Sequence, residues 1–232
     1  MNNYSPNMLK TFEQCPKKFF YKYVQKISIP QRSSLFEKGK KIHALANYYL
    51  QGQNIERMEN SLNEDERQIW QTLKSTRYFN FEPIQTEYNL SCKIGEYWVG
   101  GRLDALMRSS GLPLTPNSSP SRGEGSMCYY ILDYKTGAIP NNPQEDYQTI
   151  VYLLCVDKYL KSKNNQAESL QFVYLGLKKN QEMSILLTKE LKKHYEQKIL
   201  DICGKISLAV KSNSFQCVSE HCEKCEFRGI CR

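Results

Sequence analysis

The stretch Ile131-Leu132-Asp133-Tyr134-Lys135-Thr136-Gly137 decides the predicted fold, because an apolar, aromatic run leads directly into charged residues. Side chains of a strand alternate between its two faces, so Asp133 and Lys135 share one face while Leu132 and Tyr134 enter the other. A carboxylate and an ammonium group therefore lie on one surface at a strand end. Taken alone, this triplet is more typical of a solvated ion pair than of a catalytic site.

A second acidic residue lies in another strand-like segment, Gly100-Gly101-Arg102-Leu103-Asp104. A charge inside an apolar strand needs an ion-pair partner or a metal. If the two strands are neighbours, Asp104 and Asp133 converge, and Mg²⁺ prefers carboxylate oxygens together with water and phosphate oxygens. Lys135 would then position or activate an attacking water, or neutralise charge on a scissile phosphate.

Strands and helices mix around these two segments. Apolar periodicity and turn residues predict helices that start at Ser5-Pro6 and at Lys17, and further helices over 33–50, 61–74, 144–160 and 189–210. The same signals predict strands over 85–92, 97–107, 129–135 and 170–177. The fold class is therefore α/β or α+β. Residues 109–126 are rich in Pro, Gly and Ser, which predicts a disordered surface insertion.

Length and composition predict one domain over residues 1–232. The chain has 232 residues, 32 Lys and Arg against 24 Asp and Glu, and nine cysteines. It has no apolar run long enough to cross a bilayer and no secretory signal, so we expect no membrane partner and a cytoplasmic location. Disulfides are rare there, which leaves metal binding, catalysis or core packing for the cysteines. The net charge of +8 permits a polyanionic partner.

Three cysteines near the end of the sequence have the spacing of metal ligands. Cys222, Cys225 and Cys231 follow the pattern C-x2-C-x5-C, which lets three thiolates face one centre. The fourth ligand would come from Cys217, from His221 or from the distant Cys15, and spacing alone leaves these alternatives open. The remaining cysteines lie in apolar or amphipathic stretches and are predicted to be small core residues, namely Cys92, Cys128, Cys155 and Cys203.

A basic and aromatic segment follows Cys15. Lysines bind phosphates, and exposed aromatic rings stack on unpaired bases, so the composition of this segment fits binding of single-stranded DNA. For any one of these residues the preferred alternative is a buried ring beside a solvated lysine. The segment comprises Lys17, Lys18, Phe19, Tyr21, Lys22, Tyr23, Lys26 and Arg32.

The order of motifs resembles the RecB-type nucleases of the PD-(D/E)XK superfamily. The resemblance rests on His43, GRLD at 101–104, DYKTG at 133–137 and QTIVY at 148–152. It implies an α/β, restriction-endonuclease-like core with a mixed central sheet flanked by helices. It also implies Mg²⁺ or Mn²⁺ held by His43, Asp104, Asp133 and the Tyr134 backbone carbonyl, a catalytic Lys135, and Gln148 and Tyr152 as supports of the site or the DNA. No proline precedes Asp104 and the second acid is an aspartate, two variants that fit the RecB branch.

The cysteine pattern resembles the iron-sulfur subgroup of these nucleases, which includes the AddB nuclease domain and CRISPR-associated RecB-like exonucleases. This resemblance implies a [4Fe-4S] cluster that joins the two ends of the chain. Its implied ligands are Cys15, Cys222, Cys225 and Cys231, in a cluster region formed by residue 15 and residues 217–232. A local zinc site with Cys217 in place of Cys15 is the lesser alternative.

These patterns predict a metal-dependent enzyme that hydrolyses phosphodiester bonds in DNA. The expected substrate is single-stranded DNA attacked from an end, and the expected setting is DNA repair, recombination or CRISPR adaptation with protein partners of such a complex. The alternative from a different class is a non-catalytic nucleic-acid-binding module that needs its iron-sulfur or zinc site while its acidic residues have no catalytic role.

Overall fold

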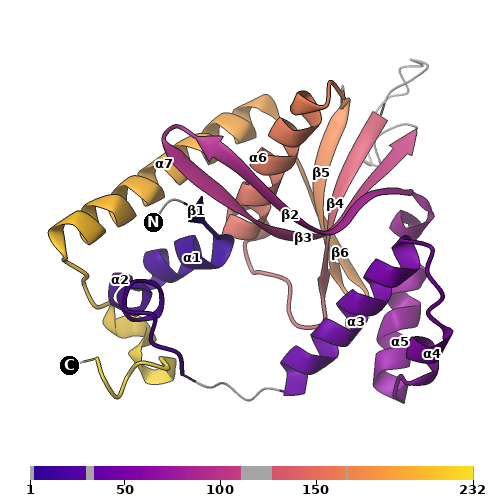
Figure 1. Ribbon diagram of the computed structural model, residues 1–232, viewed down its shortest axis with the longest axis horizontal. Coiled ribbons are helices and arrows are strands. Elements are labelled where there is room, and N and C mark those ends of the chain that lie inside the picture. The colour runs from indigo at the N-terminus through magenta and orange to yellow at the C-terminus, as the bar shows by residue number, and fades with distance from the viewer. Residues whose placement is uncertain (1–2, 30–33, 111–126, 166, 232) are drawn as a thin grey trace.

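A mixed β-sheet forms the centre of the computed structural model, which describes residues 3–29, 34–110, 127–165 and 167–231 (Figure 1). In this part of the chain the strand order is β1-β3-β4-β5-β6, and β2 pairs with β3 outside this path. The pairs β1–β3 and β4–β5 are parallel and the others are antiparallel. The strands are β1 (Asn3–Tyr4), β2 (Glu82–Ile94), β3 (Tyr97–Ser110), β4 (Met127–Lys135), β5 (Ser169–Gly176) and β6 (Gln181–Leu186).

Helices cover both faces of the sheet and give it two hydrophobic cores. One core packs α1, α6 and α7 against the sheet, and the other packs α3 and α5 against the opposite face (Figure 1). The predicted α/β class with a mixed sheet flanked by helices is confirmed. The α-helices are α1 (Pro6–Gln14), α2 (Pro16–Phe19), α3 (Ser34–Leu50), α4 (Glu56–Asn60), α5 (Glu64–Lys74), α6 (Tyr147–Ser162) and α7 (Lys189–Ser212). A π-helix spans Phe20–Val24, and 3₁₀-helices span Arg77–Asn80, Pro143–Glu145 and Ser219–Lys224.

Capping residues set the ends of several helices. The Ser5 side chain accepts a hydrogen bond from the Met8 backbone N–H and starts α1, which ends at the extended Cys15 before a proline. A capping box between Asn63 and Glu66 starts α5 at Glu64, so this helix begins three residues later than the predicted position 61.

The segment predicted to be a disordered insertion separates β3 from β4. Its first two residues belong to the sheet instead, because Ser109 and Ser110 of β3 pair with Cys128 and Met127 of β4. Strand pairing therefore corrects the predicted start of this segment, and its residues 111–126 lie outside the described part of the chain. Among the described helices, none combines the length and the apolar character that a membrane span requires.

Candidate active site

Two neighbouring strands bring the predicted aspartates together. β3 and β4 are antiparallel, and Ala105 pairs with Leu132. One residue further along this register, Asp104 on β3 lies opposite Asp133 on β4. The Tyr134 backbone N–H donates a hydrogen bond of 2.9 Å to Asp104 Oδ2, which ties the carboxylate of one strand to the backbone of the other. The predicted convergence of the two acids follows directly from this pairing.

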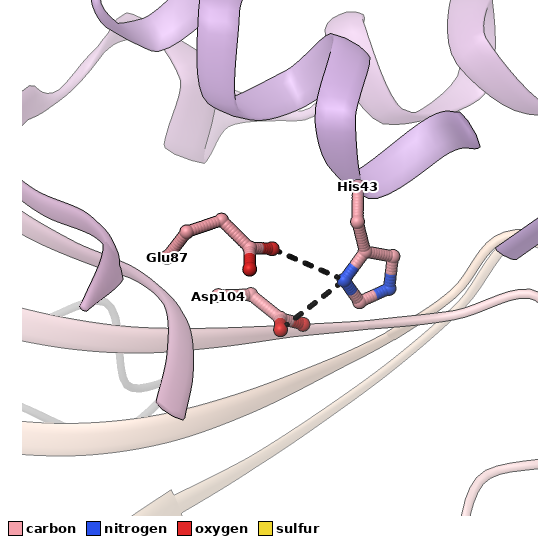
Figure 2. Close-up of side chains that lie close together, drawn as sticks. All are labelled: His43, Glu87 and Asp104. Atoms are coloured by element: carbon pink, nitrogen blue, oxygen red, sulfur yellow. Dashed lines mark ion pairs between the residues drawn. The ribbon is translucent and has the colours of Figure 1, made fainter. Parts of the chain in front are cut away.

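His43 of α3 reaches over the sheet to Asp104 (Figure 2). Its Nδ1 lies 3.2 Å from Asp104 Oδ1 and 3.6 Å from Glu87 Oε1. These three side chains form a group whose ligand atoms all lie within 4.8 Å of one another. His43 Nε2 lies 3.0 Å from the Tyr134 carbonyl oxygen; because a carbonyl only accepts, Nε2 carries a proton and donates it in this hydrogen bond, while Nδ1 faces the carboxylates.

The electrostatic field at this group favours positive charge. Burial by itself would lower the pKa of His43, but the hydrogen bond and negative charge of Asp104 outweigh burial and raise the pKa to about 9. Burial raises the pKa of Asp133 to about 6, and the charge of Asp104 adds to this effect. Carboxylate oxygens and an imidazole are ligands that divalent cations accept, so the residues present fit the metal implied by the sequence.

Asp133, Lys135 and Gln148 form a closed triangle of contacts. Lys135 Nζ lies 2.8 Å from Asp133 Oδ2 and donates a hydrogen bond of 2.9 Å to Gln148 Oε1. Gln148 Nε2 in turn donates to Asp133 Oδ1. Strand alternation thus places Lys135 beside the buried Asp133, as predicted. The side-chain amide of Gln148, on α6, contacts both groups.

Tyr152 supports the opposite strand rather than the acids. Its hydroxyl donates a hydrogen bond of 2.8 Å to the Arg102 carbonyl oxygen, two residues before Asp104. The structure therefore brings all of the predicted catalytic and divalent-metal residues to one end of the β3–β4 pair. Their chemical roles stay predictions.

Glu87 is a member of the site that sequence reasoning missed. It lies on β2 between Thr86, which pairs with Ala105, and Tyr88, which pairs with Leu103, so Glu87 faces Asp104 across the strands. Its φ angle is 47°, a left-handed conformation that non-glycine residues rarely adopt and that is enriched at functional sites. Apolar periodicity carries no signal for such a local departure from extended backbone. An acidic residue inside a predicted strand was the one available hint, as it was for Asp104.

Five cysteines line one pocket between the N-terminal helices and the C-terminal segment. The pocket has a volume of about 720 Å³, and its walls include Cys15, Cys217, Cys222, Cys225 and Cys231. Cys217 Sγ lies 3.8 Å from Cys222 Sγ and 3.7 Å from Cys231 Sγ. Within the described residues, no three of these sulfurs lie within 4.8 Å of one another. The other four cysteines are buried, which confirms that they are core residues.

The rings of Phe19 and Tyr21 in the segment after Cys15 are packed inward, as the alternative preferred for each single residue predicts, and not exposed as a stacking surface. Phe19 and Tyr21 are buried, and Tyr21 donates a hydrogen bond to the Ile230 carbonyl oxygen. Lys17 lies over the rings of Phe20 and Tyr21, and Lys18 pairs with Glu226. These rings join the two ends of the chain, so they are not available to unpaired bases. Arg32, also predicted here, lies outside the described residues.

Comparison with known proteins identifies the family to which the chain belongs. The family described as the PD-(D/E)XK nuclease superfamily matches residues 3–113 and 121–232. A crystal structure of a candidate exonuclease from Eubacterium rectale is similar to the chain in fold, with a TM-score of 0.55 and 11% identity over 95% of this chain and 86% of that one. The protein SSO0001 has a TM-score of 0.41 and 16% identity over 100% of this chain and 86% of that one. None of the curated proteins compared with the chain is significantly similar to it. Since the match extends over nearly all of the sequence, the chain belongs to the PD-(D/E)XK nuclease superfamily.

Proposed function

We propose that the protein is a Mg²⁺- or Mn²⁺-dependent DNA nuclease that removes nucleotides from single-stranded ends. The observation that carries the proposal is the joint placement of His43, Glu87 and Asp104 beside the triangle of Asp133, Lys135 and Gln148. We assign processing of DNA ends in repair, recombination or CRISPR adaptation as its setting, together with protein partners of such a complex. A single domain over residues 1–232 is part of the proposal.

His43, Asp104 and Asp133 would hold the divalent cation, with Glu87 and the Tyr134 carbonyl as further oxygen ligands. When bound, such a cation polarises the scissile phosphate and lowers the pKa of water. Lys135 lies within 2.8 Å of Asp133, so its ammonium group orients this carboxylate and is near enough to direct an attacking water. Gln148 keeps the ammonium and the carboxylate in place.

The test is cleavage of end-labelled single-stranded and double-stranded DNA with Mg²⁺ or Mn²⁺. We expect Lys135→Ala and Asp104→Asn to abolish cleavage while the fold and DNA binding persist. The matched controls are Lys205→Ala and Asp201→Asn on the exposed side of α7, which should cleave as the wild type does. Unchanged cleavage by Lys135→Ala and Asp104→Asn would contradict this assignment of the active site. A wild type that binds DNA without cleaving it would favour a binding module.

We also propose that the cysteine pocket holds a [4Fe-4S] cluster through Cys15, Cys222, Cys225 and Cys231. The choice of thiolates and the position between the chain ends support a structural clamp. Anaerobically purified protein should be brown and contain iron and sulfide. If Cys15→Ser loses the brown colour and Cys217→Ser keeps it, Cys15 is the fourth ligand. Zinc in place of iron, retained by Cys15→Ser, would support the local site instead.

A further inference from the structure

Two pockets lie at the end of β4, and each is lined by residues of the proposed active site, Lys135 and Gln148 in one and His43 and Glu87 in the other. Lys135 lines the first pocket, which has a volume of about 470 Å³ and also contains Lys10; we call it the Lys10 pocket. Thr136, the next residue, lines the second, which has a volume of about 660 Å³ and contains Tyr48; we call it the Tyr48 pocket. A DNA strand whose phosphate lies at the acidic residues would therefore have both pockets beside it.

One face of α3 forms a wall of the Tyr48 pocket. Lys40, His43, Ala44, Asn47 and Tyr48 all line it, and their spacing of three or four residues places them on one side of the helix. His43 also belongs to the proposed metal site. The Tyr48 pocket thus opens directly onto the position where the scissile phosphate would lie.

Tyr48 differs from its neighbour Tyr49 in what surrounds its ring. Tyr49 packs against Trp70 and Phe79, which belong to a hydrophobic core. Tyr48 is 39% exposed and is one of the residues that line the pocket. An exposed aromatic ring in a pocket that also contains Lys40 and Arg102 can serve as a stacking surface for a base, since every base has a π-face.

Arg102 supplies positive charge at the same pocket. Its Nε lies 2.8 Å from Glu87 Oε2, while 63% of the side chain stays exposed. A guanidinium group has five N–H donors. The contact with Glu87 is made through Nε, so the other N–H groups can donate to a phosphate. A phosphate one nucleotide away from the scissile position would meet this group.

We infer that the Tyr48 pocket binds the nucleotide next to the scissile phosphate, with its unpaired base on Tyr48 and its phosphate on Arg102. The inference rests on the proposed nuclease function and adds the requirement for an unpaired base on one side of the cut. The described walls of the Lys10 pocket contain no aromatic residue. Base stacking is therefore expected in the Tyr48 pocket and not in the Lys10 pocket. A base inside a duplex is paired and stacked on its neighbours, and it cannot occupy the Tyr48 pocket without leaving the duplex.

The test measures binding of a fluorescent single-stranded oligonucleotide by the full-length protein, with Ca²⁺ in place of Mg²⁺. Tyr48→Ala should weaken binding about 5- to 100-fold, the range expected for loss of one base stack, and Tyr48→Phe should bind as the wild type does. Trp98→Ala is the matched control, because Trp98 is 45% exposed and lines neither pocket. An oligonucleotide of abasic residues should bind wild type and Tyr48→Ala equally.

Arg102→Ala tests the phosphate contact separately. It should reduce the slope of log affinity against log salt concentration by about one. Arg108→Ala is its control, since Arg108 also lies on β3 and pairs with a glutamate of β2, Glu82. The inference is overturned if Tyr48→Ala weakens binding of intact and abasic strands by the same factor, or if Arg102 and Arg108 variants have equal slopes.

Failure of the proposed function has a different signature. A wild type that cleaves no DNA with Mg²⁺ or Mn²⁺ contradicts the nuclease proposal, whatever the binding experiment shows. A wild type that cleaves DNA while Tyr48→Ala binds intact strands with unchanged affinity contradicts the inference about the Tyr48 pocket alone.

Discussion

Gly101 has no side chain at a position where a neighbouring ring leaves no room for one. A Cβ atom there would lie 2.8 Å from the Tyr152 hydroxyl oxygen and 3.1 Å from Tyr152 Cε1. The same hydroxyl bonds to the Arg102 carbonyl oxygen, so the ring cannot move without losing that hydrogen bond. The glycine in the GRLD motif therefore serves close packing between β3 and α6.

We predict that Gly101→Ala lowers the free energy of unfolding by about 1–3 kcal/mol, as overpacking of a tight contact does. In a Tyr152→Phe background the hydroxyl is gone, and the cost of the alanine should fall by about 1 kcal/mol. Urea unfolding of the wild type, both single variants and the double variant measures this coupling. Additive costs would show that the Tyr152 hydroxyl is not what excludes the methyl group.

Gln148 links the buried Asp133 to Lys135, and its replacement should disturb catalysis more than folding. We predict that Gln148→Leu reduces the cleavage rate about 10- to 100-fold, the usual effect of losing a group that orients a metal ligand. Gln144→Leu, on the exposed surface before α6, is the matched control. The rates are compared on the same end-labelled DNA, and equal rates for both variants would refute the positioning role.

Strand alternation is the reason why Asp133 and Lys135 could be predicted as partners from sequence. Their common face follows from spacing alone, and their distance of 2.8 Å in the structure agrees with it. Glu87 could not be predicted in the same way. Its place in the site depends on a left-handed backbone and on register with β3, which are properties of the folded sheet.

At the scale of the elements, Asp157 ties the helix that bears Gln148 to the long helix α7. Its carboxylate lies 2.8 Å from Lys192 Nζ of α7 and 2.8 Å from Lys161 Nζ of α6. Burial alone would raise the pKa of Asp157, but hydrogen bonds from Lys161 and Lys192 outweigh burial and lower it. The ionised carboxylate is thus favoured in the folded protein.

This lowered pKa predicts a stability contribution that depends on pH. The contribution is complete above the pKa of an unfolded aspartate, about 3.9, and is lost as pH falls through the lower folded value. Asp157→Asn should cost about 0.5–1 kcal/mol at neutral pH and progressively less below pH ~4. Urea unfolding of both proteins across this range tests the sign, and a difference that grows in acid would contradict it.

Element positions were predictable wherever local chemistry marks them. Ser5-Pro6 at the start of α1 and the turn between β2 and β3 are such cases, the latter with Gly95 at a φ of 56°. β6 (Gln181–Leu186) was missed because five of its six residues are exposed, so it lacks apolar alternation. β1 (Asn3–Tyr4) was missed because two residues carry no periodicity; only its parallel pairing with β3 defines it.

At the scale of the whole molecule, contacts between the two ends close the chain around the cysteine pocket. The Lys17 backbone N–H donates a hydrogen bond to the Gln216 carbonyl oxygen, and Lys18 pairs with Glu226 at 2.8 Å. Figure 1 shows α2 beside the C-terminal segment, away from the sheet. Phe19 of α2 belongs to the first hydrophobic core, but the four residues of these two contacts belong to neither core. We therefore expect the junction of the two ends to depend on the pocket more than the sheet does.

We predict that removal of the proposed metal cluster from the cysteine pocket loosens the chain ends selectively. Hydrogen exchange should become faster in α2 and in residues 217–231, while amides of β4 and β5 keep their protection. Mass spectrometry of the metal-loaded and the chelator-treated protein measures both regions in one experiment. Uniform loss of protection would mean that the pocket stabilises the entire fold, and no change would mean that it is not a clamp.

The cysteine pocket also imposes an order on biosynthesis. Cys15 leaves the ribosome long before Cys217 and its neighbours, at about 5–20 residues per second on the order of tens of seconds earlier. During that interval the thiol of Cys15 has none of its pocket partners, although the sheet that lies between them in sequence is already being made. Insertion of the proposed cluster would therefore be a late step, and the supply of iron to the finished chain would then decide how much of the protein matures.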